Sequence, residues 1–197
     1  MSRLEFFFDL TSPYSYLAAT QLPAIIARTG AELVSRPMVL GGVFKGSNNT
    51  SPAGVAAKSA YMVADLARWS DLYQVPLQFN SRFPVNAISA MRLILVAEEL
   101  GKGPLLTDLA FRAVWVEDRD VAAPAELTAL ARAAGLPEGT EARIGEQAIK
   151  DRLRANTDEA VQRGAFGAPA MFVGEQLFWG NDRLHFVEAA LKKPTAP

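Results

Sequence analysis

The strand signals of this chain lie at its two ends, and this uneven placement limits the folds that the chain can adopt. Near the N-terminus, an apolar run over residues 3–9 precedes a helical pattern over 13–29, and a second strand pattern covers 31–38. This β-α-β order predicts a partly parallel sheet with a right-handed crossover. Near the C-terminus, two short strand patterns, 170–173 and 176–179, are separated by a Gly-Glu turn.

The segment between these ends is predicted to be helical almost throughout. Residues 40–52 are rich in Gly, Ser and Asn, which indicates a turn-rich loop before the helices begin. A last helix is predicted after the second pair of strands, from near Asn181 and Asp182 to near Lys192. Gly and Pro residues divide the central segment into helical patterns over 53–74, 86–100, 103–116, 124–134, 140–150 and 151–163.

Joined together, the two ends give the order of strands and helices found in thioredoxin-like proteins. We therefore predict an α/β fold in which residues 1–40 and 165–197 form a thioredoxin-like domain. Residues 41–164 form a large all-helical insertion in this prediction, and 197 residues are enough for both parts. A functional site is expected between the two parts, because pockets commonly form at such junctions.

The chain contains no cysteine and one histidine, His185. The missing cysteine excludes disulfides, thiolate metal sites and a cysteine nucleophile, and a single histidine excludes a His-rich metal site, so we predict no metal centre. No serine nucleophile and third group accompany His185, which we interpret as structural. A formal net charge of −1 argues against nucleic-acid binding, and no apolar run approaches the roughly 18 residues of a membrane span. We expect a cytoplasmic protein with a small-molecule partner.

Three motifs carry a resemblance to a known family. Residues 8–18 read Phe-Asp-Leu-Thr-Ser-Pro-Tyr-Ser-Tyr-Leu-Ala, residues 167–172 read Gly-Ala-Pro-Ala-Met-Phe, and residues 178–183 read Phe-Trp-Gly-Asn-Asp-Arg. These motifs, and the stretch from Leu40 to Pro76, resemble the 2-hydroxychromene-2-carboxylate isomerase family. Its members are glutathione-dependent enzymes of naphthalene catabolism, related to kappa-class glutathione transferases and to DsbA-like oxidoreductases. The resemblance implies a DsbA-like thioredoxin fold with a helical insertion.

Ser12 stands where a thioredoxin-type fold normally carries its redox cysteine. Ser is a preferred helix N-cap, and Pro13 suits the first helical position, so Ser12 can simply start a helix. The positive end of a helix also favours an anion. The resemblance implies that Ser12 is the catalytic residue, which binds the glutathione sulfur and holds it ionised. Both roles are compatible if the backbone caps the helix while the hydroxyl faces the ligand.

The resemblance implies two further glutathione contacts. A cis bond between Ala168 and Pro169 would turn the Ala168 N–H and C=O outward, where they can pair with the peptide backbone of glutathione as an added strand. The alternative is a proline that only starts an edge strand. At Asn181 and Asp182, backbone amides would take the γ-glutamyl carboxylate and Asp182 its ammonium, although both residues are also ordinary helix caps. An Asn-Asp pair resembles the isomerases, whereas the transferases favour Ser-Asp.

Five polar residues of the insertion are further candidates for ligand binding. Lys45 and Lys58 are candidates to anchor a carboxylate of the substrate or of glutathione, although a surface lysine is most often only solvated. The resemblance adds Asn49 as a glutathione contact. Arg82 and Asn86 are candidates for the mouth of the substrate site.

The predicted function follows from the resemblance and from the missing cysteine. We predict a glutathione-dependent isomerase that converts 2-hydroxychromene-2-carboxylate to trans-o-hydroxybenzylidenepyruvate by reversible thiolate addition to a conjugated double bond. Two alternatives stay open: a kappa-like glutathione transferase or peroxidase, which consumes glutathione, and a non-catalytic DsbA-like binding module. Relatives in the family suggest a homodimer.

Overall fold

The computed structural model describes residues 2–193; residues 1 and 194–197, which the prediction assigns to the thioredoxin-like domain, lie outside the described residues. None of the helices within 2–193 combines the length and hydropathy of a membrane span. The helices are α1 (Pro13–Thr29), α2 (Leu40–Gly46), α3 (Ala56–Tyr73), α4 (Ile88–Glu99), α5 (Gly103–Trp115), α6 (Pro124–Ala133), α7 (Gln147–Gln162) and α8 (Leu184–Leu191), with 3₁₀ helices at Pro52–Gly54, Thr140–Gly145 and Asn181–Arg183.

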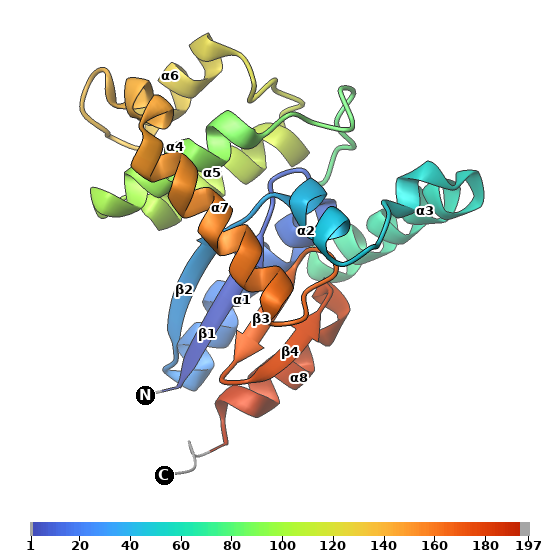
Figure 1. Cartoon of the computed structure of the whole chain (residues 1–197). Helices are drawn as coiled ribbons and strands as arrows, with labels where there is room; N and C mark the ends of the chain where they lie inside the picture. Colours follow the sequence, from blue (N-terminus) through green and yellow to red (C-terminus); the bar gives the residue numbers. More distant parts are fainter. Residues whose placement is uncertain (1, 194–197) are drawn as a thin grey trace.

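The sheet has four strands in the order β2-β1-β3-β4 (Figure 1). β1 (Arg3–Phe8) and β2 (Glu32–Pro37) pair in parallel around the α1 crossover, as predicted. β3 (Ala170–Val173) pairs antiparallel with β1 and with β4 (Gln176–Trp179), so the two ends of the chain meet in the centre of one sheet. The predicted α/β thioredoxin-like fold with a helical insertion is confirmed.

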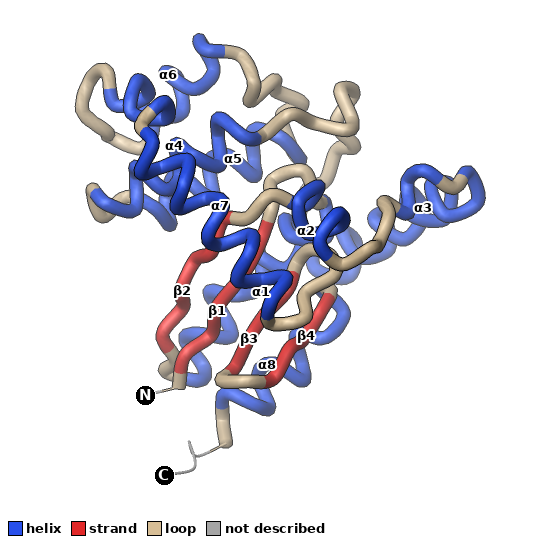
Figure 2. Tube along the Cα trace, in the orientation of Figure 1, coloured by secondary structure: helices blue, strands red, loops and turns tan. Residues whose placement is uncertain are grey.

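Helices cover both faces of the sheet, with α1 and α8 on one side and α2 and α7 on the other (Figure 2). Side chains alternate along β1, so Phe6 and Phe8 face the larger core cluster with α1 and α8. Phe7 faces the smaller cluster, which includes Val43 from α2 and Ala160 from α7. Two helices of the insertion therefore complete the core of the thioredoxin-like domain.

The prediction of a loop over residues 40–52 is wrong in its first half, which forms helix α2. Two tertiary contacts explain the difference. The Asp9 carboxylate accepts a hydrogen bond from the N–H of Leu40 at 2.7 Å, at the first turn of α2. The glycines, which indicate turns in the sequence, allow α2 to approach α7, since a Cβ at Gly46 would lie 2.9 Å from the Val161 side chain.

The predicted break between helices 140–150 and 151–163 also lies elsewhere. Thr140–Gly145 is a 3₁₀ helix, Glu146 has extended backbone angles, and α7 then runs unbroken over Gln147–Gln162. The Glu146 carboxylate accepts from the Arg143 guanidinium at 2.9 Å, which holds this bend together. The remaining predicted helices of the insertion agree with α3 to α6 to within a few residues.

The helical insertion supports the end of β1 through Trp115, the last residue of α5. Its indole is fully buried, and its N–H donates to the Leu10 carbonyl at 2.8 Å. Phe111, one turn earlier, packs against Phe8 with a ring-centroid distance of 5.4 Å. The turn that leads from β1 into α1 is therefore fixed from both parts of the chain.

Candidate functional site

Ser12 lies at the N-cap of α1, directly after the end of β1. Its extended backbone (φ −95°, ψ 113°) lets Oγ accept from the N–H of Ser15 at 3.1 Å, the usual side-chain N-cap bond. The same hydroxyl donates to the carbonyl of Ala168 at 3.1 Å, and Ser12 is 4% exposed. The condition under which the two roles were compatible, a backbone that caps while the hydroxyl faces the ligand, is not met: the hydroxyl oxygen is itself the cap, and its hydrogen is donated to the Ala168 carbonyl.

The Ala168–Pro169 bond is cis, as predicted. Pro169 is buried, and its carbonyl accepts from the N–H of Gly180 at 3.1 Å. This hydrogen bond ties the cis loop to the segment that follows β4. Ala168, whose carbonyl accepts from the Ser12 hydroxyl, is thereby linked to the turn that contains Asn181.

Asn49 contacts the same loop from the segment after α2. Its side-chain N–H donates to the Phe166 carbonyl at 2.8 Å, and its Oδ1 accepts from the N–H of Thr50 at 2.8 Å. Both polar atoms of this side chain therefore have partners within the chain. Asn49 therefore stabilises the loop that ends at Ala168.

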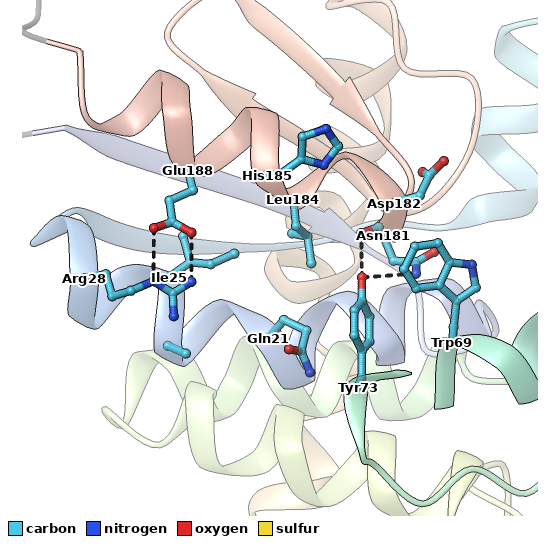
Figure 3. Close-up of a pocket in the computed structure, with 11 residues that line it drawn as sticks. Gln21, Ile25, Arg28, Trp69, Tyr73, Asn181, Asp182, Leu184, His185 and Glu188 are labelled. Carbon is cyan, nitrogen blue, oxygen red and sulfur yellow. Dashed lines mark hydrogen bonds and ion pairs between the residues drawn. The ribbon is translucent and has the colours of Figure 1, made fainter. Parts of the chain in front are cut away.

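Asn181 and Asp182 form the 3₁₀ turn before α8. Asn181 is buried, and its backbone carbonyl accepts from the Tyr73 hydroxyl at 2.9 Å (Figure 3). The Asp182 carboxylate pairs with Arg183 and lies against Gly180, where an added Cβ would be 2.5 Å from Oδ1. Neither side chain caps a helix, which removes the alternative that this pair serves only as ordinary helix caps.

A cavity of about 300 Å³ extends from this turn along α1, between α1, α3 and α8 (Figure 3). At one end lie Asn181, Asp182, Tyr73 and Trp69, and at the other the Arg28–Glu188 ion pair, at 2.8 Å. Burial raises the pKa of the Tyr73 phenol, which keeps its hydroxyl protonated as a donor. His185 is an exposed residue on the wall of this cavity.

Helix α3 joins the site through Tyr14, in the first turn of α1. The Tyr14 hydroxyl donates to Asp65 Oδ2 at 2.9 Å, and burial together with the Asp65 carboxylate raises the pKa of Tyr14. The C-terminal half of α3 is thus held beside Ser12. Its N-terminal half, with Lys58 and an exposed Tyr61, extends away from the rest of the molecule (Figure 1).

The other predicted substrate-binding residues are exposed or engaged elsewhere. Lys45, at the end of α2, and Asn86, before α4, are exposed. Arg82 is engaged elsewhere: its guanidinium donates to the Asp118 carbonyl at 3.0 Å and lies 3.9 Å from the Asp120 carboxylate. The structure brings Ser12, Ala168 and Pro169 into one cluster with Asn49 and Asn181 at its edges, and it does not bring Arg82 into that cluster.

Sequence reasoning missed Asp9, whose carboxylate holds the turn that leads to Ser12. Asp9 is 4% exposed; its two carboxylate oxygens accept from the N–H groups of Thr11 and Leu40, at 2.9 and 2.7 Å, while burial raises the pKa of the carboxyl. It thus joins the turn before Ser12 to the start of α2. Its position directly after an apolar strand run was the one available signal.

The arrangement around Ser12 is suited to an anion that also carries a peptide group. The N-terminus of α1 and a hydroxyl donor stabilise negative charge. The backbone of Ala168, at the same point, can pair with an extended peptide.

Comparisons with known proteins agree with this geometry. The family model of the DSBA-like thioredoxin domain matches residues 3–192. A 2-hydroxychromene-2-carboxylate isomerase from Sphingobium xenophagum is 34% identical over 95% of this chain and 97% of its own length. Glutathione S-transferase kappa 1 from Caenorhabditis elegans is 29% identical over 98% of this chain and 92% of its own. A solved structure of selenomethionine 2-hydroxychromene-2-carboxylate isomerase superposes with a TM-score of 0.88 and 28% identity, covering 96% of this chain and 94% of the other.

Proposed function

Because this chain belongs to the DSBA-like thioredoxin domain family and, within it, to the 2-hydroxychromene-2-carboxylate isomerases, we propose that it converts 2-hydroxychromene-2-carboxylate to trans-o-hydroxybenzylidenepyruvate with glutathione as cofactor. The observation that carries the proposal is the contact between Ser12 and Ala168, 3.1 Å apart at the start of α1. It brings together a hydroxyl, a helix N-terminus and the backbone of Ala168, whose carbonyl accepts from that hydroxyl.

The residues present fit glutathione as a peptide thiol. The Ala168 backbone would pair with its peptide backbone, Asn181 and Asp182 would receive the γ-glutamyl end beside the 300 Å³ cavity, and Asn49 would contact it from the insertion. When bound, glutathione supplies a thiolate that adds reversibly to the conjugated double bond of the ring-opened substrate and so permits rotation about it.

The role of the chain is to hold and stabilise that thiolate. The Ser12 hydroxyl donates to the sulfur, and the N-terminus of α1 favours its negative charge, so the thiol is ionised at neutral pH. These groups are fixed by the protein before the reaction, which keeps the reorganisation during the reaction small. Lys45 and Lys58 are the proposed anchors of the substrate carboxylate, and Asn86 is proposed for the mouth of the substrate site. Arg82 would join that mouth only by leaving Asp118 and Asp120. A cytoplasmic location, where glutathione is the main thiol pool, and a homodimer belong to the same proposal.

A kappa-like glutathione transferase or peroxidase is the second candidate, favoured by the 29% identity to glutathione S-transferase kappa 1 over 98% of the chain. Both candidates use the same activated thiolate, but only the transferase or peroxidase consumes glutathione. Following the ultraviolet change of the substrate together with the glutathione concentration separates them. A chain that binds neither glutathione nor substrate would instead be a DsbA-like binding module.

The test of the proposed catalytic residue is Ser12→Ala. Losing a hydrogen bond to a charged sulfur costs about 1.5–3 kcal/mol, so turnover should fall roughly ten- to a hundredfold and the pKa of the bound thiol should rise. The lost N-cap should lower the stability by about 1 kcal/mol, which a melting curve reports separately.

The matched control is Ser2→Ala. This substitution removes the hydrogen bond that the Ser2 hydroxyl donates to the Leu191 carbonyl. The bond lies at the opposite end of the sheet from Ser12, so activity should stay unchanged. Unchanged turnover and thiol pKa in Ser12→Ala would leave Ser12 as a helix cap only.

A further inference from the structure

The Ser12 hydroxyl has one hydrogen, and the structure shows where it goes. A hydroxyl donates to one acceptor at a time and can accept through its lone pairs. Ser12 Oγ accepts from the N–H of Ser15 and donates to the carbonyl of Ala168, both at 3.1 Å. The hydrogen needed for a bound sulfur is therefore engaged by the backbone of the cis loop.

We propose that Ser12 exchanges its acceptor when a peptide thiol binds, and that this exchange makes the site selective for peptide thiols over simple thiols. The cysteinyl N–H of the ligand donates to the Ala168 carbonyl in place of Ser12, and the released hydroxyl of Ser12 donates to the sulfur. This inference rests on the proposed function and adds to it the exchange of acceptors at Ser12.

The geometry allows the exchange with little movement. Ser12 is 4% exposed and its oxygen stays bonded to the N–H of Ser15, so only the hydroxyl hydrogen rotates and Oγ keeps its place. No proton leaves the hydroxyl; the proton lost on ionisation of the ligand thiol goes to solvent. Because Ser12 Oγ lies 3.1 Å from the Ala168 carbonyl oxygen, a ligand whose sulfur reaches Ser12 brings the residue that carries the sulfur beside Ala168.

The exchange has a definite energetic consequence. A neutral hydrogen bond in a protein contributes about 0.5–1.5 kcal/mol, and one to a charged group about 1.5–3 kcal/mol. A simple thiol gains the hydrogen bond from Ser12 to its charged sulfur. It loses the neutral hydrogen bond from Ser12 to the Ala168 carbonyl, which is left without that donor. A peptide thiol restores a donor to that carbonyl and keeps the full benefit at the sulfur.

The test uses three ligands: glutathione, glutathione N-methylated at the cysteinyl amide, and, as a matched control, glutathione N-methylated at the glycyl amide. The pKa of each bound thiol is read from its ultraviolet thiolate absorbance. Glutathione and the glycyl analogue should behave alike. The cysteinyl analogue should retain a several-fold smaller thiolate-to-thiol ratio at neutral pH, roughly three- to tenfold by the cost of one neutral hydrogen bond.

The variant Ser12→Ala completes the cycle. With no hydroxyl to release, the three bound ligands should show the same thiol pKa. Equal thiol pKa values for glutathione and the cysteinyl analogue on the unaltered protein would overturn the exchange, and this comparison needs no variant. A difference between the analogues that persists in Ser12→Ala would overturn it as well, because the amide would then act without Ser12. If binding to the protein leaves the thiol pKa of glutathione unchanged, the proposed function is refuted together with the exchange.

Discussion

The two ends of the candidate site differ in how far their polar groups are already fixed. At the inner end, formed by Ser12, Ala168, Pro169 and Asn181, hydroxyl, carbonyl and amide groups are bonded within the chain. The proposed substrate contacts Lys45, Lys58 and Asn86, which we call the outer rim, are exposed residues, and Lys58 lies on the half of α3 that extends away from the rest of the molecule. In the proposed reaction, a preorganised inner end would suit the sulfur anion of the bound thiol. Exposed side chains would suit the carboxylate of the proposed substrate.

The largest effect should come from Gly180→Ala at the inner end. Gly180 has φ 94° and ψ 154°, a region that side chains rarely adopt, and its added Cβ would lie 2.5 Å from Asp182 Oδ1. We expect a loss of about 2 kcal/mol, or roughly 4–8 °C in melting temperature, and weaker glutathione binding. Thermal melting and calorimetric titration measure the two effects.

Gly54→Ala is the matched control in the exposed segment before α3. An added Cβ there meets no atom within 4 Å. Its melting temperature should stay close to that of the unaltered protein. Equal losses in the two variants would show that the loss at Gly180 does not come from its backbone conformation or its contact with Asp182.

The next effect is on glutathione affinity, in Asp182→Asn. Removing the carboxylate that is proposed to hold the ligand ammonium should weaken glutathione about five- to thirtyfold, or ~1–2 kcal/mol, while the affinity for the aromatic substrate changes less. Calorimetric titration of both ligands measures this, with Asp158→Asn, an exposed carboxylate on α7, as the control. Unaltered glutathione affinity would exclude Asp182 from the ligand site.

Tyr73→Phe should give a smaller change of the same kind. The variant removes the hydroxyl that donates to the Asn181 carbonyl at 2.9 Å and keeps the ring, whose centroid lies 5.1 Å from that of Trp69. Losing one neutral hydrogen bond, about 1 kcal/mol, should raise the KM for glutathione about fivefold with kcat unchanged. Tyr61→Phe, on an exposed face of the same helix, should change neither constant. A lower kcat with unchanged KM would contradict a role in positioning Asn181.

The smallest effect should come from Lys58→Ala at the outer rim. An exposed charge pair contributes about 0–1 kcal/mol, so the substrate KM should rise no more than a few-fold, and the increase should disappear at high salt. Lys102→Ala, an exposed lysine in the turn between α4 and α5, is the control. A salt-independent rise of tenfold or more in the substrate KM would place Lys58 in the fixed part of the site. It would contradict the contrast between the two ends.

The sequence is sufficient to predict those parts of the fold that depend on local signals. The bounds of β3 and β4 were predicted as observed, because two short apolar runs flank Gly174, whose φ of 57° forms the turn. Helix α2 was missed because its glycines indicate a turn locally, whereas in the fold they permit contact with α7. That contact depends on the tertiary structure and leaves no periodic pattern in the sequence.

The candidate site shows the same division. Ser12, Ala168 and Pro169 were predicted as neighbours because each belongs to a motif with a known place in the thioredoxin fold. The bonds from Tyr14 to Asp65 and from Tyr73 to Asn181 join residues 51 and 108 positions apart. No local spacing pairs such residues, so the way in which α3 holds the site was visible only in the structure.

Ser12 also gives the start of α1 a group that oxidants leave intact. The sulfenic and sulfinic acids that form on a reactive cysteine thiolate have no counterpart on a serine hydroxyl. In the proposed reaction, oxidative damage therefore falls on the small thiol bound there, and that thiol leaves by dissociation. Repair consists of replacing one soluble molecule with another, without a reductase acting on the protein. In the proposed reaction, the activity should depend on the concentration of reduced thiol in the cell. It should recover fully when that concentration is restored after oxidation.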